Sequence, residues 1–354
     1  MRGGIVLFAK RPGVTSFSSL FSIKRALGTK KVGHTGTLDS FASGLLVVCT
    51  GSLTRIASYI TSFNKTYDAV IEFGVETDTL EYTGKIVKTA PLPKKDDVLS
   101  ALEHYTGGIL QTPPLFSALH INGERASDIA RSGRVAEMPS RPVTVYASEA
   151  EEFLFEAGDR VKAVRVRFSV SKGTYIRSLA RDIGSCCKSA AHLAGLRRLS
   201  VGSFRLEDAA GFSSLAPFTL QSVYQTISDM QKIQSACKAD ASEHTPHSGE
   251  DVQSEVREKM QTMTALLAAE CGFGTAHIFP EYEDDFKHGR PLFSSMFEKG
   301  AGGVCETSDV FSANGTCAAG GERSIAVFGK HGNFLGMISR NGEDAYSYAF
   351  VIPD

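Results

Sequence analysis

The sequence lacks the short motifs that bind the common cofactors and metal ions of enzymes. It has no GxxxxGK[ST] phosphate loop, no GxGxxG turn, no HExxH helix and no HxE pattern followed by PCxxC. Its seven cysteines are an odd number with no CxxC pair, which argues against a disulfide framework and against a thiolate zinc site. We therefore expect no cofactor and no metal, and chemistry that comes from ordinary side chains.

Long apolar runs are also absent. No stretch reaches the roughly 18 to 20 residues that a membrane span needs, and the opening apolar run at residues 4–9 is too short for a signal sequence. With 354 residues, 42% of them hydrophobic, the chain is long enough for two domains or for one large domain with an appendage. We expect a soluble, cytoplasmic protein with no membrane association.

The net charge of −1 conceals an uneven distribution of charge along the chain. Residues 1–210 carry 28 Lys and Arg against 20 Asp and Glu, whereas residues 211–354 carry 10 against 19. A polyanion would therefore meet the first part of the chain. An ordinary combination of one basic and one acidic domain would give the same numbers.

Residues 1 to about 210 alternate short apolar strands with amphipathic helices, which predicts an α+β or α/β fold. The clearest strand is 164–170, where apolar residues alternate with Arg165, Arg167 and Ser169. Further strands are predicted at 44–51 and 65–74, and helices at 53–63, 96–105, 126–132 and 174–187.

The last third of the chain has a different composition. Residues 235–261 are polar with almost no large apolar side chains, and residues 300–321 are rich in Gly, Ser and Ala, so we interpret them as a surface insertion or linker and a long loop. Strand-like runs at 277–293 and 324–352 predict a small β-rich unit. The expected domains are 1–230, a polar linker with a possible helix at 231–274, and 275–354.

The most informative stretch is 31–50, KVGHTGTLDSFASGLLVVCT. Gly33 and Gly36 permit a tight loop that ends at Asp39, and an apolar strand begins beyond Gly44. This arrangement would hold one carboxylate on a rigid edge. The alternative is an ordinary loop aspartate that forms an Asx turn or caps a helix.

This stretch resembles the GHxGTLDPxAxGLL motif of the TruB family of pseudouridine synthases. Five supporting motifs occur in the family's order within residues 5–210: KRPGVTS at 10–16, KTY at 65–67, QTPPLFSAL at 111–119, SKGTYIRSLARDIG at 171–184 and LAGLRRLSVGSF at 193–204. The resemblance implies an α+β fold with a mixed β-sheet catalytic core and flanking helices. It also implies that residues 275–354 form a small β-rich, PUA-like RNA-binding domain.

The chain departs from the family pattern at three positions. Ser40 stands where the family usually has proline after the aspartate, which would leave the loop less stiff without removing the carboxylate. His120 and Ser127 stand where lysine and tyrosine are common. These two changes put RNA contacts there in doubt, but not the chemistry.

The resemblance assigns the chemistry to Asp39, Tyr67 and Arg177. Asp39 would act as nucleophile or stabilise positive charge while the C1′–N1 bond opens. Arg177 would pair with it through a two-point fork, and Tyr67 would stack on the extruded uracil and approach C5. Without the resemblance, Arg177 would be interpreted as a surface arginine and Tyr67 as a core residue.

Other positions match residues that line the substrate in the family. Tyr175 and Leu196 would otherwise be core residues, and His34 would be a solvated loop histidine instead of a contact for the flipped nucleotide. The cations expected to contact phosphates, some of which must be merely solvated, are Lys10, Arg11, Lys30, Lys31, Lys172, Arg181, Arg197 and Arg198.

Three hypotheses follow for the function. The first is an isomerase that makes the pseudouridine of the tRNA T arm, at position 55, as a monomer that needs no cofactor and no guide RNA. The second is an RNA-binding protein that remodels tRNA without catalysis. The third is a guide-RNA-dependent synthase with the same aspartate motif.

Overall fold

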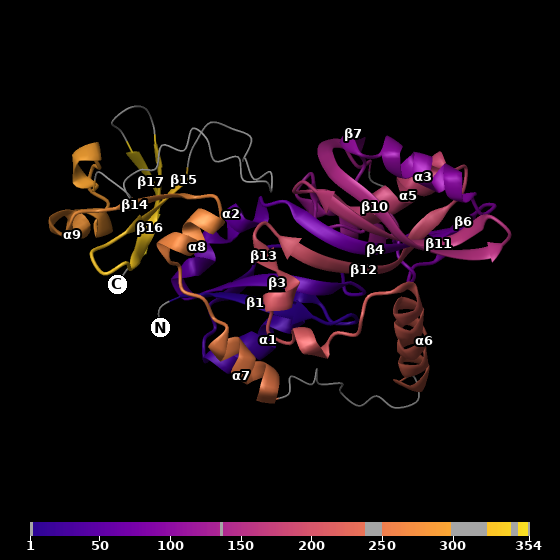
Figure 1. Ribbon diagram of the computed structural model, residues 1–354, viewed down its shortest axis with the longest axis horizontal. Coiled ribbons are helices and arrows are strands. Elements are labelled where there is room, and N and C mark those ends of the chain that lie inside the picture. Colours follow the sequence, from indigo (N-terminus) through magenta and orange to yellow (C-terminus); the bar gives the residue numbers. More distant parts are fainter. Residues whose placement is uncertain (1–2, 135–136, 238–249, 299–323, 341–345, 353–354) are drawn as a thin grey trace.

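A nine-stranded sheet forms the centre of the computed structural model, which describes residues 3–134, 137–237, 250–298, 324–340 and 346–352 (Figure 1). Its strand order is β1-β3-β12-β4-β11-β10-β7, with β2 paired to β3 and β13 paired to β12. The strands are β1 Ile5–Lys10, β2 Val32–His34, β3 Ser43–Thr50, β4 Lys65–Phe73, β7 Gly107–Gln111, β10 Arg141–Ala157, β11 Arg160–Val170, β12 Ala191–Val201 and β13 Phe204–Arg205.

The sheet is mixed, as expected. β3 and β12 run parallel, and the other neighbours in the order run antiparallel. The predicted strands are confirmed as β3, β4 and β11. On the cationic side of β11, Arg165 and Arg167 both form ion pairs with Asp68 of β4, at 3.4 and 2.8 Å.

Helices cover both faces of the sheet (Figure 1). On one face, α3 Lys95–His104 and α5 Ile176–Cys186 pack over a core that includes Tyr67, Ile71 and Phe168. On the other face, α6 Leu220–Cys237 packs over Val70 and Ala194. α3, α4 Ala126–Arg131 and α5 were predicted, whereas α6 was not.

The region predicted as one helix at 53–63 is divided. A 3-10 turn, η1 Gly51–Ile56, precedes a short helix, α2 Ala57–Thr61. The hydroxyl of Thr54 donates to the carbonyl of Gly51 at 2.9 Å, and such a bond to the i−3 carbonyl favours a tight turn over a regular helix.

The helix α1 Ser16–Leu27 packs beside β1 and β3 together with α7 Glu250–Glu258. Val256 of α7 is fully buried, and Ile5 and Gln261 exchange two backbone hydrogen bonds of 2.8 Å. Residues 250–261 therefore pack against the main body through Val256 and the partly buried Val252 and Met260, while the rest of the segment is exposed or partly exposed. Residues 238–249 and 300–321 lie outside the described residues.

A second sheet at the C-terminal end has the order β14-β15-β16-β17. Its strands are β14 Gly274–His277, β15 Ser324–Phe328, β16 Phe334–Arg340 and β17 Tyr346–Val351. Phe328 and Met337 of this sheet share a core with Leu7, Cys49 and Met263, so the small unit packs against the main body. The predicted small β-rich C-terminal unit is confirmed.

The remaining elements are short. They are β5 Val75–Thr77, β6 Ile86–Thr89, β8 His120–Ile121, β9 Glu124–Arg125, η2 Leu206–Asp208, η3 Phe212–Ser214, α8 Ala265–Glu270, η4 Pro280–Tyr282, α9 Glu283–Lys287 and η5 Ser294–Met296. Within the part of the chain that the structure describes, no helix combines the length and the apolar character needed to cross a membrane.

Candidate active site

Asp39 lies in the loop that joins β2 to β3, and its side chain is 34% exposed. The loop is fixed on one side by Ser16 of α1, whose hydroxyl accepts from the Leu38 amide at 2.8 Å and donates to the Leu38 carbonyl at 3.0 Å. On the other side, the Gly13 amide donates to the Ser40 carbonyl at 2.8 Å. These bonds fix the backbone around Asp39 although Ser40 replaces the proline of the family pattern.

Lys10 stabilises the same loop from inside the protein. Its side chain is fully buried, and its ammonium donates to the carbonyls of Ala42 at 2.5 Å, Arg11 at 3.0 Å and Ser40 at 3.3 Å. Burial lowers the pKa of Lys10 to about 7, with the charge of Asp39 opposing this effect and that of Arg198 adding to it. The predicted phosphate contact at Lys10 is therefore wrong, because the side chain points into the core.

Arg177 of α5 is the partner of Asp39. Its Nη2 donates to Oδ1 of Asp39 at 3.0 Å and to the Phe116 carbonyl at 2.9 Å, and its Nη1 donates to the Thr79 carbonyl at 3.0 Å. The guanidinium is only 7% exposed. The structure shows one nitrogen–oxygen contact with Asp39, where a two-point fork was expected. The carbonyls of Thr79 and Phe116 accept from Nη1 and Nη2, and the buried Nε has no hydrogen-bond partner among the described residues.

Tyr67 and Leu196 lie on the neighbouring strands β4 and β12 and pack in the same core cluster as residues of the aspartate loop. Both are buried, at 8% and 5% exposure, and both belong to a cluster that contains Leu38 and Phe41 from either side of Asp39. The structure thus brings these two predicted substrate-lining residues to the aspartate loop.

Tyr175 immediately precedes α5. Its amide donates to the side-chain oxygen of Gln111 at 2.8 Å, and its carbonyl accepts from the amide nitrogen of Gln111 at 3.1 Å. Burial raises the pKa of the Tyr175 phenol, and the nearby charges of Arg177 and Asp39 act on it in opposite directions. Tyr175 therefore lies within electrostatic reach of the Asp39–Arg177 pair.

His34 lies on β2, at the start of the aspartate loop, and is half-buried. Burial lowers the pKa of its imidazole, as does the charge of Arg198. Its Nδ1 is buried and finds no hydrogen-bond partner among the described residues. An unpaired ring nitrogen beside the loop is compatible with a contact to substrate.

Arg198 links β12 to this loop. It is 2% exposed, and it donates to the carbonyls of Leu45 at 2.8 Å and Gly36 at 3.1 Å. Gly44 has a φ of +111°, and a Cβ there would lie 2.3 Å from the Arg198 carbonyl oxygen. The close approach of β3 and β12 therefore requires glycine at this position.

The eight cations predicted to contact phosphates divide into three groups by exposure. Lys10, Arg197 and Arg198 are buried, so those three predictions are wrong. Arg181 is partly buried and is bonded to Asp182 at 2.8 Å and to the Thr112 carbonyl at 3.0 Å. The exposed members are Arg11, Lys30, Lys31 and Lys172.

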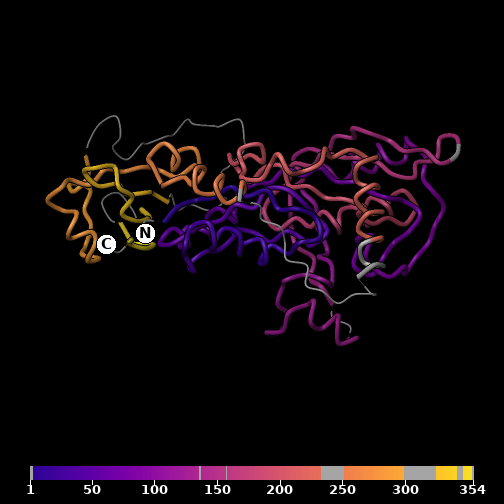
Figure 2. Tube along the Cα trace, turned by 90° about the horizontal axis from the view of Figure 1, so that it is seen from below, coloured from indigo at the N-terminus to yellow at the C-terminus, as the bar shows by residue number. Residues whose placement is uncertain are grey.

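Residues 112–134 form an arm that projects from the body of the molecule (Figure 2). Its root is fixed near the site, because Ser178 donates to the Thr112 carbonyl at 2.8 Å and Arg177 donates to that of Phe116. His120 and Ser127 both lie in the arm, so these departures from the family pattern leave the Asp39–Arg177 pair intact.

Two further polar residues lie close to the pair, Gln111 and Glu81, and neither was predicted from the sequence. Burial raises the pKa of Glu81, and the charges of Asp39 and Arg177 lie near enough to affect it. The motif at 111–119 contained Gln111 without indicating its role, and no pattern pointed to Glu81.

Comparison with known proteins agrees with this geometry. The model of the TruB family pseudouridylate synthase (N terminal domain) matches residues 24–176. The "tRNA pseudouridine synthase B" of Treponema denticola is 46% identical over 229 residues, which are 61% of this chain and 64% of that protein. The protein of the same name from Treponema pallidum (strain Nichols) is 36% identical over 365 residues, covering 93% of this chain and 98% of its own.

A solved structure described as "Crystal Structure of a Cbf5-Nop10-Gar1 Complex" contains a chain with the same fold. Its TM-score is 0.60 at 22% sequence identity, and the match covers 99% of this chain and 85% of the other. Together with the family model and the Treponema relatives, these matches establish that the chain belongs to the TruB family of pseudouridine synthases.

Proposed function

We propose that this protein is a tRNA pseudouridine synthase that isomerises the uridine at position 55 in the T arm. One observation carries the proposal: a partly exposed carboxylate, Asp39, lies on a loop fixed from both sides and is paired with the buried guanidinium of Arg177 at 3.0 Å. Relatives named tRNA pseudouridine synthase B support the choice of RNA.

The reaction breaks the C1′–N1 bond, turns the detached uracil and rejoins it through C5, so it needs no net redox change and no transferred group. Asp39 is proposed as the nucleophile or as the charge that stabilises the opening bond. Arg177 stabilises the negative charge of Asp39. Tyr67 is proposed to stack on the uracil and to approach C5, with Tyr175 and Leu196 lining the base.

The uridine must leave its stack to reach Asp39, at a cost of a few kcal/mol that contacts in the pocket offset. His34 is proposed to contact the flipped nucleotide, and Arg11, Lys30, Lys31 and Lys172 to contact phosphates. The C-terminal unit is proposed as a PUA-like RNA-binding domain. We further propose that the protein acts in the cytoplasm as a monomer, without guide RNA.

The test is position-specific detection of pseudouridine in a tRNA transcript incubated with the purified protein. The wild type should modify position 55, whereas Asp39→Asn should bind the same tRNA and form no pseudouridine. Full activity of Asp39→Asn would exclude the assigned nucleophile. An Asp39→Asn protein that refolds misfolded tRNA as well as the wild type would show an additional, non-catalytic role.

The fold shared with a chain of the Cbf5 complex keeps a guide-RNA-dependent synthase as the second candidate. A bare T-arm stem-loop discriminates between the two. The proposed stand-alone enzyme should modify it with no other component, whereas a guide-dependent enzyme should leave it unmodified.

A further inference from the structure

Two phenylalanine rings are exposed on the outer side of α1. Phe17 is 63% exposed and Phe21 is 57% exposed. Their ring centroids lie 5.8 Å apart, edge to face, and the ammonium of Lys24 lies 5.4 Å from each centroid. We call Phe17, Phe21 and Lys24 the α1 aromatic patch. Adjacent exposed aromatic rings are typical of surfaces that a ligand covers.

The patch rests on a rigid support. The opposite side of α1 is buried in the core through Leu20, Ile23 and Leu27. Thr15 caps the helix by accepting from the Ser18 amide, and Gly28 ends it in the left-handed conformation. The two rings are therefore presented in a fixed orientation, which reduces the entropy lost when a flat ligand stacks on them.

The patch begins beside the candidate active site. Ser16, which holds Leu38 through two hydrogen bonds, is the residue immediately before Phe17. α7 covers a different side of α1, where Arg257 donates to the Ala26 carbonyl at 2.8 Å. The patch thus starts at the end of α1 that is bonded to the aspartate loop, although the side chains of Ser16 and Phe17 point to different sides of the helix.

The surrounding charge selects the kind of ligand. The first 38 residues contain seven Lys and Arg and no Asp or Glu, although Lys10 is fully buried and does not add to the charge around the patch. Arg25, Lys30 and Lys31 are exposed at the end of α1 and just beyond it. Aromatic rings surrounded by cations are the combination that binds single-stranded nucleic acid, because bases stack while the cations neutralise phosphates.

We propose that the α1 aromatic patch stacks on unpaired bases of the RNA substrate, outside the pocket that receives the extruded uridine. Lys24 neutralises a phosphate next to these bases. The identity of the RNA rests on the proposed function. The patch would be a second place where the enzyme binds unpaired nucleotides.

The test compares the full-length Phe17→Ala/Phe21→Ala variant with the wild type on a tRNA transcript. The dissociation constant should rise by roughly 5- to 100-fold, the range expected for losing one stacked base. The single-turnover rate at saturating tRNA should stay within about twofold, because the patch does not touch the reacting atoms. Phe17→Leu/Phe21→Leu should bind as weakly as the alanine variant, and Phe17→Trp/Phe21→Trp should bind like the wild type.

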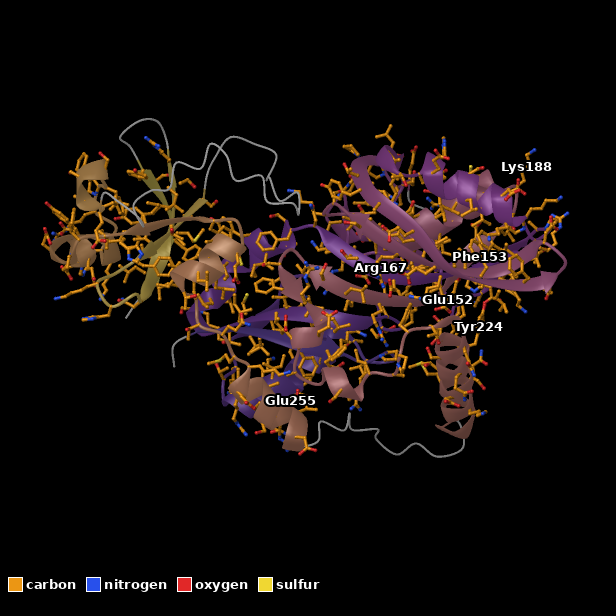
Figure 3. All side chains as sticks on the ribbon, viewed as in Figure 1. Glu152, Phe153, Arg167, Lys188, Tyr224 and Glu255 are labelled. Atoms are coloured by element: carbon orange, nitrogen blue, oxygen red, sulfur yellow. The ribbon has the colours of Figure 1, made fainter. Side chains whose placement is uncertain are left out.

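A matched cluster provides the control. Phe153 and Phe155 on β10 stack at 6.0 Å with Lys95 over the Phe153 ring, and Figure 3 shows Phe153 on the β10–β11 part of the sheet. Phe155→Ala should leave the dissociation constant unchanged.

Three outcomes would overturn the proposal: an alanine double variant that binds tRNA within twofold of the wild type, a leucine variant that keeps full affinity, and an altered oligomeric mass with unchanged RNA binding. The test measures RNA binding, so it can be interpreted even if the wild type forms no pseudouridine. That second result would contradict the proposed function but not the role of the α1 aromatic patch.

Discussion

Among the aspartate–arginine pairs of the described residues, Asp39–Arg177 and Asp68–Arg167 are opposite in exposure. In the Asp39–Arg177 pair the carboxylate is 34% exposed and the guanidinium 7%. In the Asp68–Arg167 pair the carboxylate is 5% exposed and the guanidinium 42%. Figure 3 shows Arg167 with Glu152 on the side of the sheet where α6 lies. The first pair presents an anion to solvent, whereas the second buries it.

The partners of each carboxylate explain the difference. Both oxygens of Asp68 accept from arginines, Oδ1 from Arg167 at 2.8 Å and Oδ2 from Arg167 at 3.1 Å and Arg165 at 3.4 Å. Arg177 instead makes two of its three hydrogen bonds to backbone carbonyls and only one to Asp39, whose side chain stays 34% exposed. The two pairs therefore differ in how much of the carboxylate the arginine occupies.

The largest expected effect comes from removing the buried cation of the first pair. Arg177→Met should lower the single-turnover rate by about 10²- to 10³-fold, the range seen when one preorganised donor is lost from an active site. The carbonyls of Thr79 and Phe116 also lose their donor. Quantifying pseudouridine under single-turnover conditions measures the effect.

Arg177→Lys is the matched control, since it keeps the charge but lacks the planar fork whose two terminal nitrogens reach Asp39 and the two carbonyls. It should fall between Arg177→Met and the wild type. A methionine variant with more than about a tenth of the wild-type rate would contradict the role of Arg177.

Breaking the second pair should affect stability instead of activity. Asp68→Asn should lower the free energy of unfolding by about 2 kcal/mol, because this buried carboxylate loses the charge-assisted hydrogen bonds that it accepts from Arg165 and Arg167. Urea denaturation measures this loss, and the folded variant should form pseudouridine at the wild-type rate. Asp39→Asn should show the reverse pattern. Equal losses of stability for Asp68→Asn and Asp39→Asn would contradict the different roles assigned to the two pairs.

The sequence predicted the parts of the fold that depend on local periodicity. The strict alternation of Val164, Val166 and Phe168 sufficed for β11, and the buried run after Gly44 sufficed for β3. α7 was interpreted as part of a linker because only Val256 is fully buried in an otherwise polar segment, and its contact with α1 is long-range. Hydrophobic periodicity alone does not predict a helix such as α7, which packs through so few apolar residues.

The site was predicted only in part, for a related reason. Asp39 and Arg177 are 138 residues apart, and only the family motifs connected them before the structure showed their contact. Lys10 and Arg198 were expected at the surface because unpaired charges are rarely buried. Backbone carbonyls of distant loops satisfy both side chains, and nothing in the local sequence reveals such acceptors.

The buried Lys10 should make the free energy of unfolding depend on pH. Its pKa of about 7 in the folded protein lies below the ordinary 10.5, so the unfolded chain binds one more proton between these values. The free energy of unfolding should therefore rise with pH above 7, by about 1 kcal/mol per pH unit from this group. Lys10→Met should remove that contribution from denaturation curves recorded between pH 7 and 9.

Lys65 is a necessary control for this measurement, because burial also lowers its pKa to about 7. Lys65→Met should reduce the slope by a similar amount while leaving the Lys10 contribution in place. A Lys10→Met slope identical to that of the wild type would show that the ammonium remains fully charged in the folded protein.

The smallest effect is expected where α6 joins the side of the sheet that contains Asp68. The hydroxyl of Tyr224 donates to Glu72 of β4 at 3.0 Å, and Glu152 accepts from the Leu220 amide at 3.1 Å. Tyr224→Phe removes one of these bonds and should lower the free energy of unfolding by about 1 kcal/mol. Pseudouridine formation should be unchanged, because Glu72 and Tyr67 point to opposite faces of β4. A loss of activity without a loss of stability would mean that the two faces of the sheet are coupled. The face that contains Glu72 and Asp68 would then affect the reaction as well as the stability of the fold.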